Sequence, residues 1–322
     1  MIDPTSPSAV PPPIAVPEHT MIRRIGGGGC GEVWLAKNTL GAYRAVKIVR
    51  FREVGRRHIS ENEFAGILKF EPVSRLHDGL VDILQVGGGE AEGYFYYVME
   101  LADCAIAGLV IDAATYVSRT LAQDINHRGR LPVGECIRLG AAIASALGFL
   151  HRQNLIHRDL KPSNIIFVNG FPKLADIGLV AGMSGEREYV GTEGFIPPEG
   201  CGTAQADLYS LGKVLYEMST GNSADKYPAL PADMGTGPDD PELAQFNQII
   251  VKACRTSPRL RYHSADELMM ALLSFQFNQE DAHRGFRGRS LARTIGVVGA
   301  VIGAAFVIFL VWRLIWLMQH TE

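Results

Sequence analysis

The spacing of hydrophobic and polar residues changes along the chain, and each change predicts a different kind of structure. Residues 1–19 are rich in proline and lack a regular apolar pattern, which is typical of an extended, solvated arm. After this arm, short runs of β-branched and aromatic residues separated by glycines predict strands. The clearest runs lie at 43–49, 80–86 and 94–101, the last two joined by a glycine-rich turn at 87–93.

Beyond residue 131 the apolar positions recur with the period of an α-helix. Asn169-Gly170, between two short apolar runs, predicts a β-hairpin at 165–168 and 172–176. The segment 103–131 is longer than a simple connection, and we expect a packed connector or a surface for a partner there, with a short helix near 116–123. The predicted long helices lie at 132–153, from Asp207 onward, at 242–254 and at 264–276.

Composition excludes several classes of protein. The chain of 322 residues has a formal net charge of −3, so it lacks the strongly basic character of a typical nucleic-acid-binding protein, and we expect no nucleic-acid partner. Its 5 cysteines are scattered without a C-x-x-C pair, which favours reduced thiols over disulfides or a zinc site. Residues 1–20 do not have the pattern of a signal peptide.

Residues 157–164 read His-Arg-Asp-Leu-Lys-Pro-Ser-Asn, and their polar side chains suit phosphoryl transfer. The carboxylate of Asp159 can accept the proton of a substrate hydroxyl. Lys161 can neutralise phosphate charge, and the amide oxygen of Asn164 can hold a metal ion. A polar turn is the alternative, since Pro and Asn favour turns, but it does not account for the whole stretch.

A glycine-rich stretch lies between two strand-like runs near the start of the chain, with the pattern Gly26-x-Gly28-x-x-Gly31-x-Val33. Glycine allows a hairpin turn to lie close over phosphates, with backbone N–H groups available to them. A glycine-rich linker has a similar composition, but it would not be flanked by strands.

Lys47 ends the Ala-Val-Lys element of the next strand. In the pattern of protein kinases, which this element resembles, such a lysine contacts phosphates and pairs with a glutamate on the next helix. Glu61 and Glu63 both precede an apolar helical stretch. We prefer Glu63, because Ile67 then lies on the same helical face and can pack inward, and Glu61 remains an alternative. Asp176, in Asp176-Ile177-Gly178, supplies a carboxylate suited to Mg²⁺.

These motifs, in this order over residues 21 to about 276, resemble a bacterial Hanks-type (eukaryotic-like) serine/threonine protein kinase. The resemblance implies an α+β, bilobal fold, with a small β-rich lobe at 20–100, a larger helical lobe at 101–276, and ATP and Mg²⁺ between them. It implies that Asn164 and Asp176 hold the metal and that the catalytic residues are Asp159, Lys161, Asn164 and Lys47. The residues it places around the nucleotide are Ile25, Gly26, Gly28, Gly31, Val33, Ala45, Lys47, Glu63, Met99, Glu100, Leu101, Ile166 and Asp176.

The resemblance also implies supporting and regulatory roles. Glu199 is expected to form a buried ion pair with Arg261, and Asp207 to brace the catalytic loop. Lys161 together with Thr192 is similar to the pair that accompanies serine/threonine specificity, and His157 is implied to be structural, packed under Ile177. Ile177 itself stands where the family has Phe, and Phe195 and Pro197 stand where it has Tyr and Ala.

Arg158 beside the catalytic aspartate suggests a regulatory charge. In the family such an arginine usually meets a phosphate on the activation segment. Glu188 stands four residues before Thr192, where the phosphorylated residue typically lies. We therefore hypothesise that Glu188 supplies a permanent negative charge, and the alternative is a solvated loop acid.

The C-terminal part predicts a membrane anchor. A basic linker at 277–294 carries four arginines, Arg284, Arg287, Arg289 and Arg293, and precedes residues 295–312, which contain no charged side chain. A helix of this length spans roughly the hydrocarbon core of a bilayer. We expect a transmembrane helix at 295–317, a tail at 318–322, and a kinase domain that faces the cytoplasm by the positive-inside rule. A buried soluble helix is the alternative.

Small-residue spacing within this segment, Gly299-x-x-x-Gly303, favours helix pairing and hence a homodimer.

Taken together, the motifs and the anchor predict an active, membrane-anchored kinase that phosphorylates Ser and Thr of cytoplasmic proteins. A nucleotide-binding pseudokinase scaffold is the alternative, and the presence of Lys47, Asp159 and Asp176 argues against it.

Overall fold

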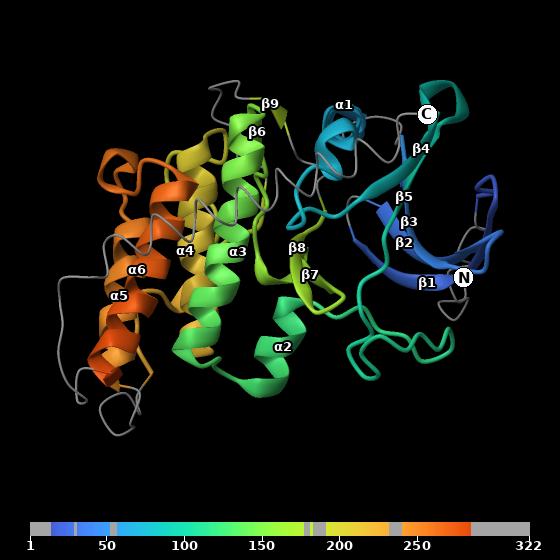
Figure 1. The fold of residues 1–322 in the computed structure, drawn as a ribbon. Coiled ribbons are helices and arrows are strands. Elements are labelled where there is room, and N and C mark those ends of the chain that lie inside the picture. The colour runs from blue at the N-terminus through green and yellow to red at the C-terminus, as the bar shows by residue number, and fades with distance from the viewer. Residues whose placement is uncertain are drawn as a thin grey trace, which may run out of the picture. The chain divides into compact units, whose positions relative to one another are not determined.

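The computed structural model describes residues 14–28, 31–51, 57–176, 181–182, 191–231 and 240–284. The chain divides into two units, residues 1–276 and 277–322, and the first contains the two lobes of an α+β fold. Figure 1 shows the β-rich N-lobe on the right and the helical C-lobe on the left. The predicted bilobal architecture is confirmed.

The N-lobe is an antiparallel sheet with the strand order β1-β2-β3-β5-β4 and one long helix, α1 (Arg57–Ser74). Side chains alternate between its two faces with the period of a strand. Phe95 and Tyr97 belong to the core that includes Ile67 of α1, whereas Tyr96 and Val98 lie in the opposite cluster with Trp34. The strands are β1 (His19–Gly28), β2 (Gly31–Asn38), β3 (Tyr43–Arg50), β4 (Ile83–Gly89) and β5 (Tyr94–Met99).

The C-lobe is built from helices packed around α3 (Val133–Arg152). Among the described residues, α3 is the one helix long and apolar enough to cross a membrane, and 61% of its most apolar stretch is buried within the fold. The other helices are α2 (Leu121–Arg128), α4 (Ala204–Thr220), α5 (Asp240–Ala253) and α6 (Ala265–Arg284). Short strand pairs complete the lobe: β6 (Leu155–Ile156) with β9 (Ala181–Gly182), and β7 (Ile165–Val168) with β8 (Phe171–Leu174). Single 3₁₀ turns lie at Glu90–Glu92, Pro162–Asn164, Ala224–Lys226 and Pro258–Leu260.

Most predicted elements are present, and the differences have physical causes. The strand expected at 80–86 lies at 83–89, because Leu80 and Val81 pair with Leu174 of the C-lobe instead of with the sheet. The expected glycine-rich turn begins later, since Gly87 continues the strand and leaves room for the Tyr96 side chain that a Cβ there would overlap. The short helix starts at Leu121, where Thr120 and Gln123 form a capping box.

The N-terminal arm differs from the expectation for its last residues. Val16 is only 4% exposed and packs in one cluster with Trp34 and Val46 on the face of the sheet opposite α1, and β1 begins at His19. Burial of an apolar side chain favours this placement over a solvated chain. Val16 is thus packed rather than solvated, whereas Ala15, Pro17 and Glu18 are exposed, and residues 1–13 lie outside the described part of the chain.

Residues 104–118, which we name the hinge strap, leave the N-lobe after β5 and return to it. Tyr116 and Cys104 pack with Leu35 of β2, and Arg23 of β1 donates a hydrogen bond of 2.6 Å to the carbonyl of Ala113 and a second to that of Tyr116. Cys104 and Tyr116 are buried, as expected of a packed connector, whereas residues 105–110 are exposed. Ile106, Leu109 and Val110 of the strap remain exposed.

Several predictions concern residues outside the described ranges, namely Ile177, Glu188, the anchor at 295–317 and the tail at 318–322.

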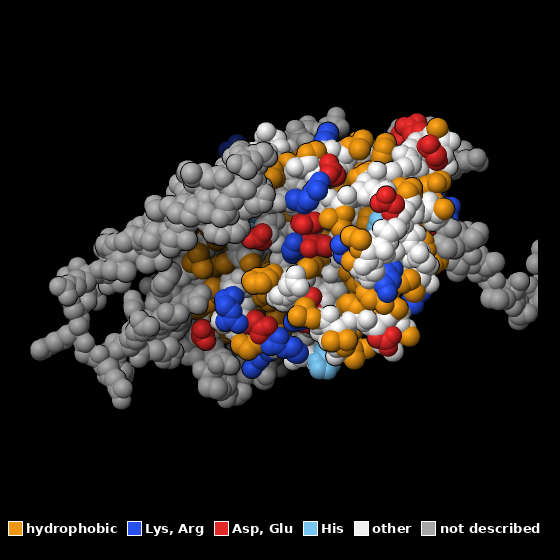
Figure 2. All heavy atoms as spheres, turned by 45° about the vertical axis from the view of Figure 1, so that its right-hand side comes forward, with side chains coloured by type: hydrophobic (Ala, Val, Ile, Leu, Met, Phe, Trp, Pro, Cys, Tyr) orange, Lys and Arg blue, Asp and Glu red, His pale blue; other side chains and the backbone are white. Residues whose placement is uncertain are grey.

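On the face drawn in Figure 2, acidic and basic side chains of the described residues are interspersed, and neither sign of charge dominates.

Candidate active site

A cavity of about 530 Å³ lies between the sheet and the C-lobe. Its volume suits a ligand the size of a nucleotide. Among the described residues of the predicted set, Glu63 does not line it but pairs with Lys47, and Gly28 pairs with Gly31 in the hairpin. The predicted residues that do line it are Ile25, Gly26, Gly31, Val33, Ala45, Lys47, Met99, Glu100, Leu101, Asp159, Lys161, Asn164, Ile166 and Asp176.

The hairpin of β1 and β2 forms the roof of this cavity. Gly26 pairs with Val33, so the residues on either side of the turn face each other across the two strands. Gly31 has φ +132°, and a Cβ at that position would lie 2.5 Å from the carbonyl oxygen of Ile48. Glycine is therefore required there both by conformation and by space.

Lys47 is almost fully buried beneath the roof and lies between two carboxylates. Its Nζ is 2.8 Å from Oε1 of Glu63 and also contacts Oδ1 of Asp176. Burial disfavours the charge of Lys47, but the acidic groups around it, Tyr97, Asp176 and Glu63, raise the pKa of Lys47 well above its ordinary value. The ammonium is thus charged, and Glu63 rather than Glu61 is its partner.

The catalytic loop gathers its polar groups around Asp159. Lys161 donates to Asp159 Oδ2 at 2.8 Å and to Thr192 Oγ1 at 2.7 Å, and Thr192 Oγ1 donates to Asp159 Oδ1 at 2.7 Å. Asn164 Nδ2 donates to the backbone carbonyl and to Oδ2 of Asp159, at 2.8 and 3.0 Å. The carboxylate is held in a single orientation at the edge of the cavity.

The backbone of this loop is braced from beneath by Asp207 of α4, which is 1% exposed. Its carboxylate accepts hydrogen bonds from the backbone N–H groups of His157 and Arg158, at 2.9 and 3.0 Å. Arg158 has φ +68°, an unfavourable conformation for a side chain of this size, which these bonds help to maintain. The expected bracing role of Asp207 is confirmed, and His157 is fully buried, with Nε2 3.2 Å from the carbonyl of Ala175.

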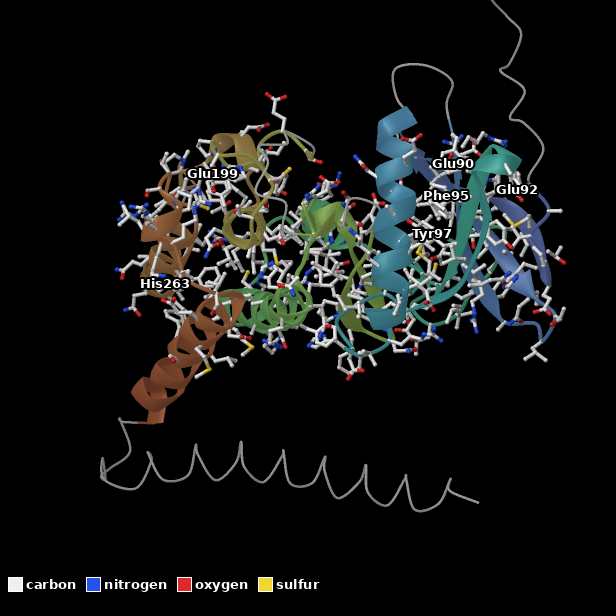
Figure 3. All side chains as sticks on the ribbon, turned by 90° about the horizontal axis from the view of Figure 1, so that it is seen from above. Glu90, Glu92, Phe95, Tyr97, Glu199 and His263 are labelled. Carbon is white, nitrogen blue, oxygen red and sulfur yellow. The ribbon has the colours of Figure 1, made fainter. Side chains whose placement is uncertain are left out.

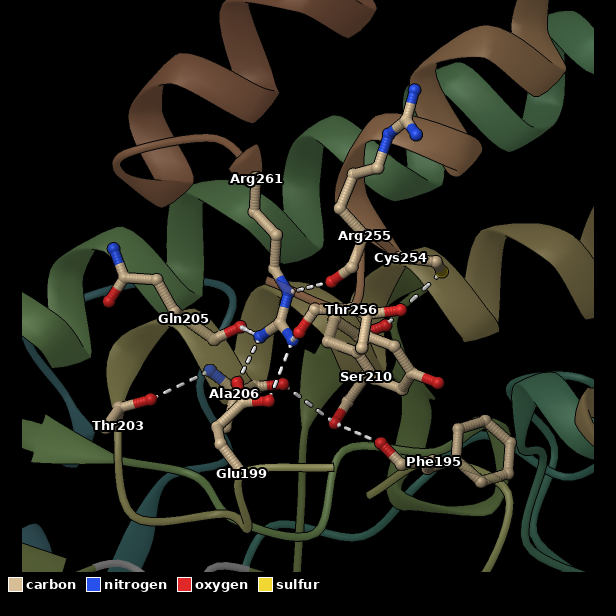
Figure 4. Close-up of polar contacts among 11 residues, drawn as sticks. Phe195, Glu199, Thr203, Gln205, Ala206, Ser210, Cys254, Arg255, Thr256 and Arg261 are labelled. Atoms are coloured by element: carbon tan, nitrogen blue, oxygen red, sulfur yellow. Dashed lines mark hydrogen bonds and ion pairs between the residues drawn. The ribbon is translucent and has the colours of Figure 1, made fainter. Parts of the chain in front are cut away.

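A second support lies below the loop that carries Thr192. Figure 4 shows the guanidinium of Arg261 between the carboxylate of Glu199 and three backbone carbonyls. Arg261 is 1% exposed, and the bidentate contact with Glu199 includes one bond of 2.9 Å. The predicted ion pair is confirmed.

Several lining residues that the sequence did not identify come from the hinge strap and α2. Tyr116 donates from its hydroxyl to the carbonyl of Ala102 at 3.0 Å, and both residues line the cavity. Burial raises the pKa of Tyr116 to about 12, so the hydroxyl remains a donor at neutral pH. The signal in the sequence that points to this part of the site is the capping-box pattern of Thr120 and Gln123 at the start of α2. The unpredicted lining residues are Gly27, Tyr97, Ala102, Tyr116, Val117, Ser118, Thr120, Gln123, Ser163 and Ala175.

The described residues contain no cluster of three His, Cys, Asp or Glu side chains that would hold a metal by themselves. The pair of Asp176 and Asn164 nevertheless fits Mg²⁺, which usually takes one or two carboxylates together with waters and substrate phosphates. Nδ2 of Asn164 is used by Asp159, which leaves its amide oxygen as the group available to a cation. The side chain of Asp176 is 42% exposed toward the cleft.

Comparison with known proteins agrees with this geometry. A family model described as a protein kinase domain matches residues 19–272. The chain is similar to serine/threonine-protein kinase PrkC of Bacillus subtilis, with 28% identity over 276 residues that cover 78% of this chain and 39% of PrkC. It is also similar to a probable serine/threonine-protein kinase PknB of Bifidobacterium longum, with 29% identity over 297 residues that cover 83% of this chain and 41% of that protein.

The chain therefore spans about two-fifths of the length of these curated relatives. Among solved structures, the crystal structure of the PknI kinase domain of Mycobacterium tuberculosis is similar, with a TM-score of 0.58 and 21% sequence identity. The similarity covers 82% of this chain and 98% of that chain and shows a shared fold.

Proposed function

Because this chain belongs to the protein kinase family, we propose that it is an active serine/threonine kinase that transfers the γ-phosphoryl group of ATP to protein hydroxyls. The observation that carries the proposal is the arrangement around Asp159. Its carboxylate contacts Lys161, Asn164 and Thr192 at the edge of the cavity that Lys47 and Asp176 also line.

Each of these side chains has a role that follows from its position. Asp159 accepts the proton of the Ser or Thr hydroxyl as the new O–P bond forms and the bond to the ADP oxygen breaks. Lys161 and Lys47 place positive charge on the two sides where phosphate oxygens carry negative charge. Mg²⁺, held by Asp176 and Asn164, would supply charge neutralisation for the phosphates.

Phosphate transfer by the purified full chain tests this proposal. We expect incorporation of phosphate from labelled Mg-ATP into the chain itself or into a generic protein substrate, on Ser and Thr only. Asp159→Asn is expected to lower kcat at least about 100-fold and to leave nucleotide affinity within a factor of two, because proton acceptance is lost without loss of a binding group. Nucleotide binding without transfer in the wild type would instead establish the pseudokinase alternative.

The membrane anchor at 295–317 forms a second part of the proposal, and its support is the apolar composition of that segment after a basic linker. We propose a single-pass protein with a cytoplasmic kinase domain that pairs through Gly299 and Gly303. Carbonate extraction of membranes and crosslinking in them test anchoring and dimerisation. Release of the protein from membranes by carbonate would refute anchoring. Crosslinking that yields only monomers would refute dimerisation.

The activating role of Glu188 remains a proposal as well, supported by the burial of Arg158 and by the position of Glu188 in the sequence. A carboxylate carries one charge against about 1.5 to 2 for a phosphate, so the activation should be partial. Phosphatase-treated enzyme should retain activity that Glu188→Ala loses. Full activity of phosphatase-treated Glu188→Ala would refute it.

A further inference from the structure

Tyr97 carries a buried hydroxyl, and its ring lies near the ion pair of Lys47 and Glu63. In the sheet, Tyr97 of β5 is the register partner of Lys47 on β3, so the two side chains share the face that looks toward the cleft and α1. Figure 3 shows Tyr97 and Phe95 between strand β5 and helix α1. Lys47 Nζ lies 5.8 Å from the centroid of the Tyr97 ring.

The hydroxyl of Tyr97 has an unused proton. The residue is 2% exposed, and its proton has no acceptor among the residues that the structure describes. Lys47 is its nearest charged neighbour along the sheet, but an ammonium only donates, so it cannot accept the Tyr97 proton. A buried donor without an acceptor is unfavourable, and a pocket that retains one has a reason to do so.

The matching acceptor is the carboxylate of Glu63. Glu63 is 1% exposed, and neither of its oxygens receives a well-directed hydrogen bond from the described residues, although Lys47 lies 2.8 Å away as an ion-pair partner. Burial raises the pKa of Tyr97, Lys47 lowers it, and Glu63 raises it, so all three groups share one electrostatic environment. A residue with a spare donor and a carboxylate with spare acceptor sites therefore lie on either side of the same ammonium, that of Lys47.

Lys47 is also tied to Asp176 in this structure, and that tie conflicts with the role proposed for Asp176. When Asp176 holds a metal ion and Lys47 also contacts phosphate oxygens, the charge of Lys47 is shared between those oxygens and the buried Glu63. We propose that Tyr97 is a positioning residue whose hydroxyl then donates to Glu63, which keeps Glu63 and Lys47 in place for the nucleotide. This inference rests on the proposed kinase function.

Tyr97→Phe tests the inference, because it removes only the oxygen. The matched control is Tyr96→Phe on the same strand, since Tyr96 faces the opposite side of the sheet, where its hydroxyl accepts from Gln85 at 3.2 Å. We expect the Kd and KM for Mg-ATP to rise about tenfold in Tyr97→Phe, because this variant loses one hydrogen bond to a charged group. The kcat should change less than about twofold. Tyr96→Phe should leave all three within about twofold of the wild type.

Two further measurements separate positioning from packing. The thermal midpoint of ligand-free Tyr97→Phe should equal or exceed that of the wild type, because an unbonded buried hydroxyl is removed, while the increase on adding Mg-ATP should be smaller. In a Glu63→Gln background, Tyr97→Phe should have little additional effect on Kd.

The outcomes are distinct. Nucleotide affinity unchanged in Tyr97→Phe, with a wild type that binds and transfers phosphate, would overturn this inference and leave the proposed function intact. A wild type that does not bind Mg-ATP would overturn both. An equal loss of affinity in Tyr97→Phe and Tyr96→Phe would identify a general effect of the strand and also overturn it.

Discussion

Replacement of Arg261 by alanine should destabilise the C-lobe more than any surface substitution, because Arg261 is a buried cation with a complete set of acceptors. Its guanidinium donates to Glu199 and to the carbonyls of Arg255, Gln205 and Thr256. Alanine removes all these donors at once. It leaves three backbone carbonyls and a carboxylate that is only 23% exposed without the group that compensates them.

The magnitude follows from this geometry. Removal of one partner of a buried ion pair costs about 3–5 kcal/mol, mostly because the remaining charge stays desolvated. A loss of about 4 kcal/mol corresponds to a fall in Tm of roughly 8–16 °C for a domain of this size. Since the whole free energy of unfolding of a domain is about 5–15 kcal/mol, the variant should be folded at 25 °C and unstable at moderate temperature.

The assay is urea unfolding followed by far-UV circular dichroism, with Arg152→Ala as the matched control. Arg152 pairs with Asp266 at 2.8 Å, but the two side chains are 55% and 50% exposed, so this variant should lose less than about 1 kcal/mol. Arg261→Lys should fall between the two, because an ammonium cannot form the bidentate contact. Equal destabilisation by Arg261→Ala and Arg152→Ala would refute the reasoning.

Three further predictions follow from the structure. Gly31→Ala should raise the KM for ATP several-fold, because φ +132° and the carbonyl of Ile48 leave no room for a Cβ. The control Gly134→Ala in α3 should leave the KM unchanged, and equal kinetics of the two variants would contradict the prediction. Val16→Ala should lower the free energy of unfolding, measured in urea, by about 1–2 kcal/mol, because Val16 is buried against the sheet. The control Val110→Ala, at a position 68% exposed, should change this free energy little, and equal effects of the two variants would count against packing of Val16. Burial raises the pKa of Cys136 and of Cys254 to about 12, so alkylation at pH 8 should reach these thiols only after unfolding in urea; mass spectrometry that finds rapid labelling of the native protein would show that prediction to be wrong.

The parts of the site that the sequence predicts are those whose chemistry allows few residue types. Asp159, Lys161 and Asn164 lie in one continuous loop, so their spacing is fixed locally, and the structure places them together at the cavity. Helical periodicity favours Glu63 over Glu61, and in the structure Glu63 pairs with Lys47. In each case a short-range rule determined the geometry.

The parts that the sequence did not predict depend on contacts between distant segments. Tyr116 is held at the cavity by Arg23 and Leu35, both far from it in the chain, which bind the hinge strap to β1 and β2. Val16 is buried because Trp34 and Val46 leave an apolar surface to cover, which a proline-rich composition does not reveal. Tyr97 belongs to a strand that periodicity predicts, but the missing acceptor for its hydroxyl becomes visible only once Glu63 is placed.

The hinge strap has a consequence for the design of selective inhibitors. A compound that occupies the cavity would meet Tyr116, Val117 and Ser118 along one wall, all from this segment. The hydrogen bond from Tyr116 to Ala102 and the bonds from Arg23 keep that wall in place before any compound arrives. A chemical group that fills the space beside Tyr116 would therefore gain contacts with the hinge strap. A kinase with a shorter connection after the last strand of the N-lobe would not supply these contacts, so such a compound would bind this chain more tightly.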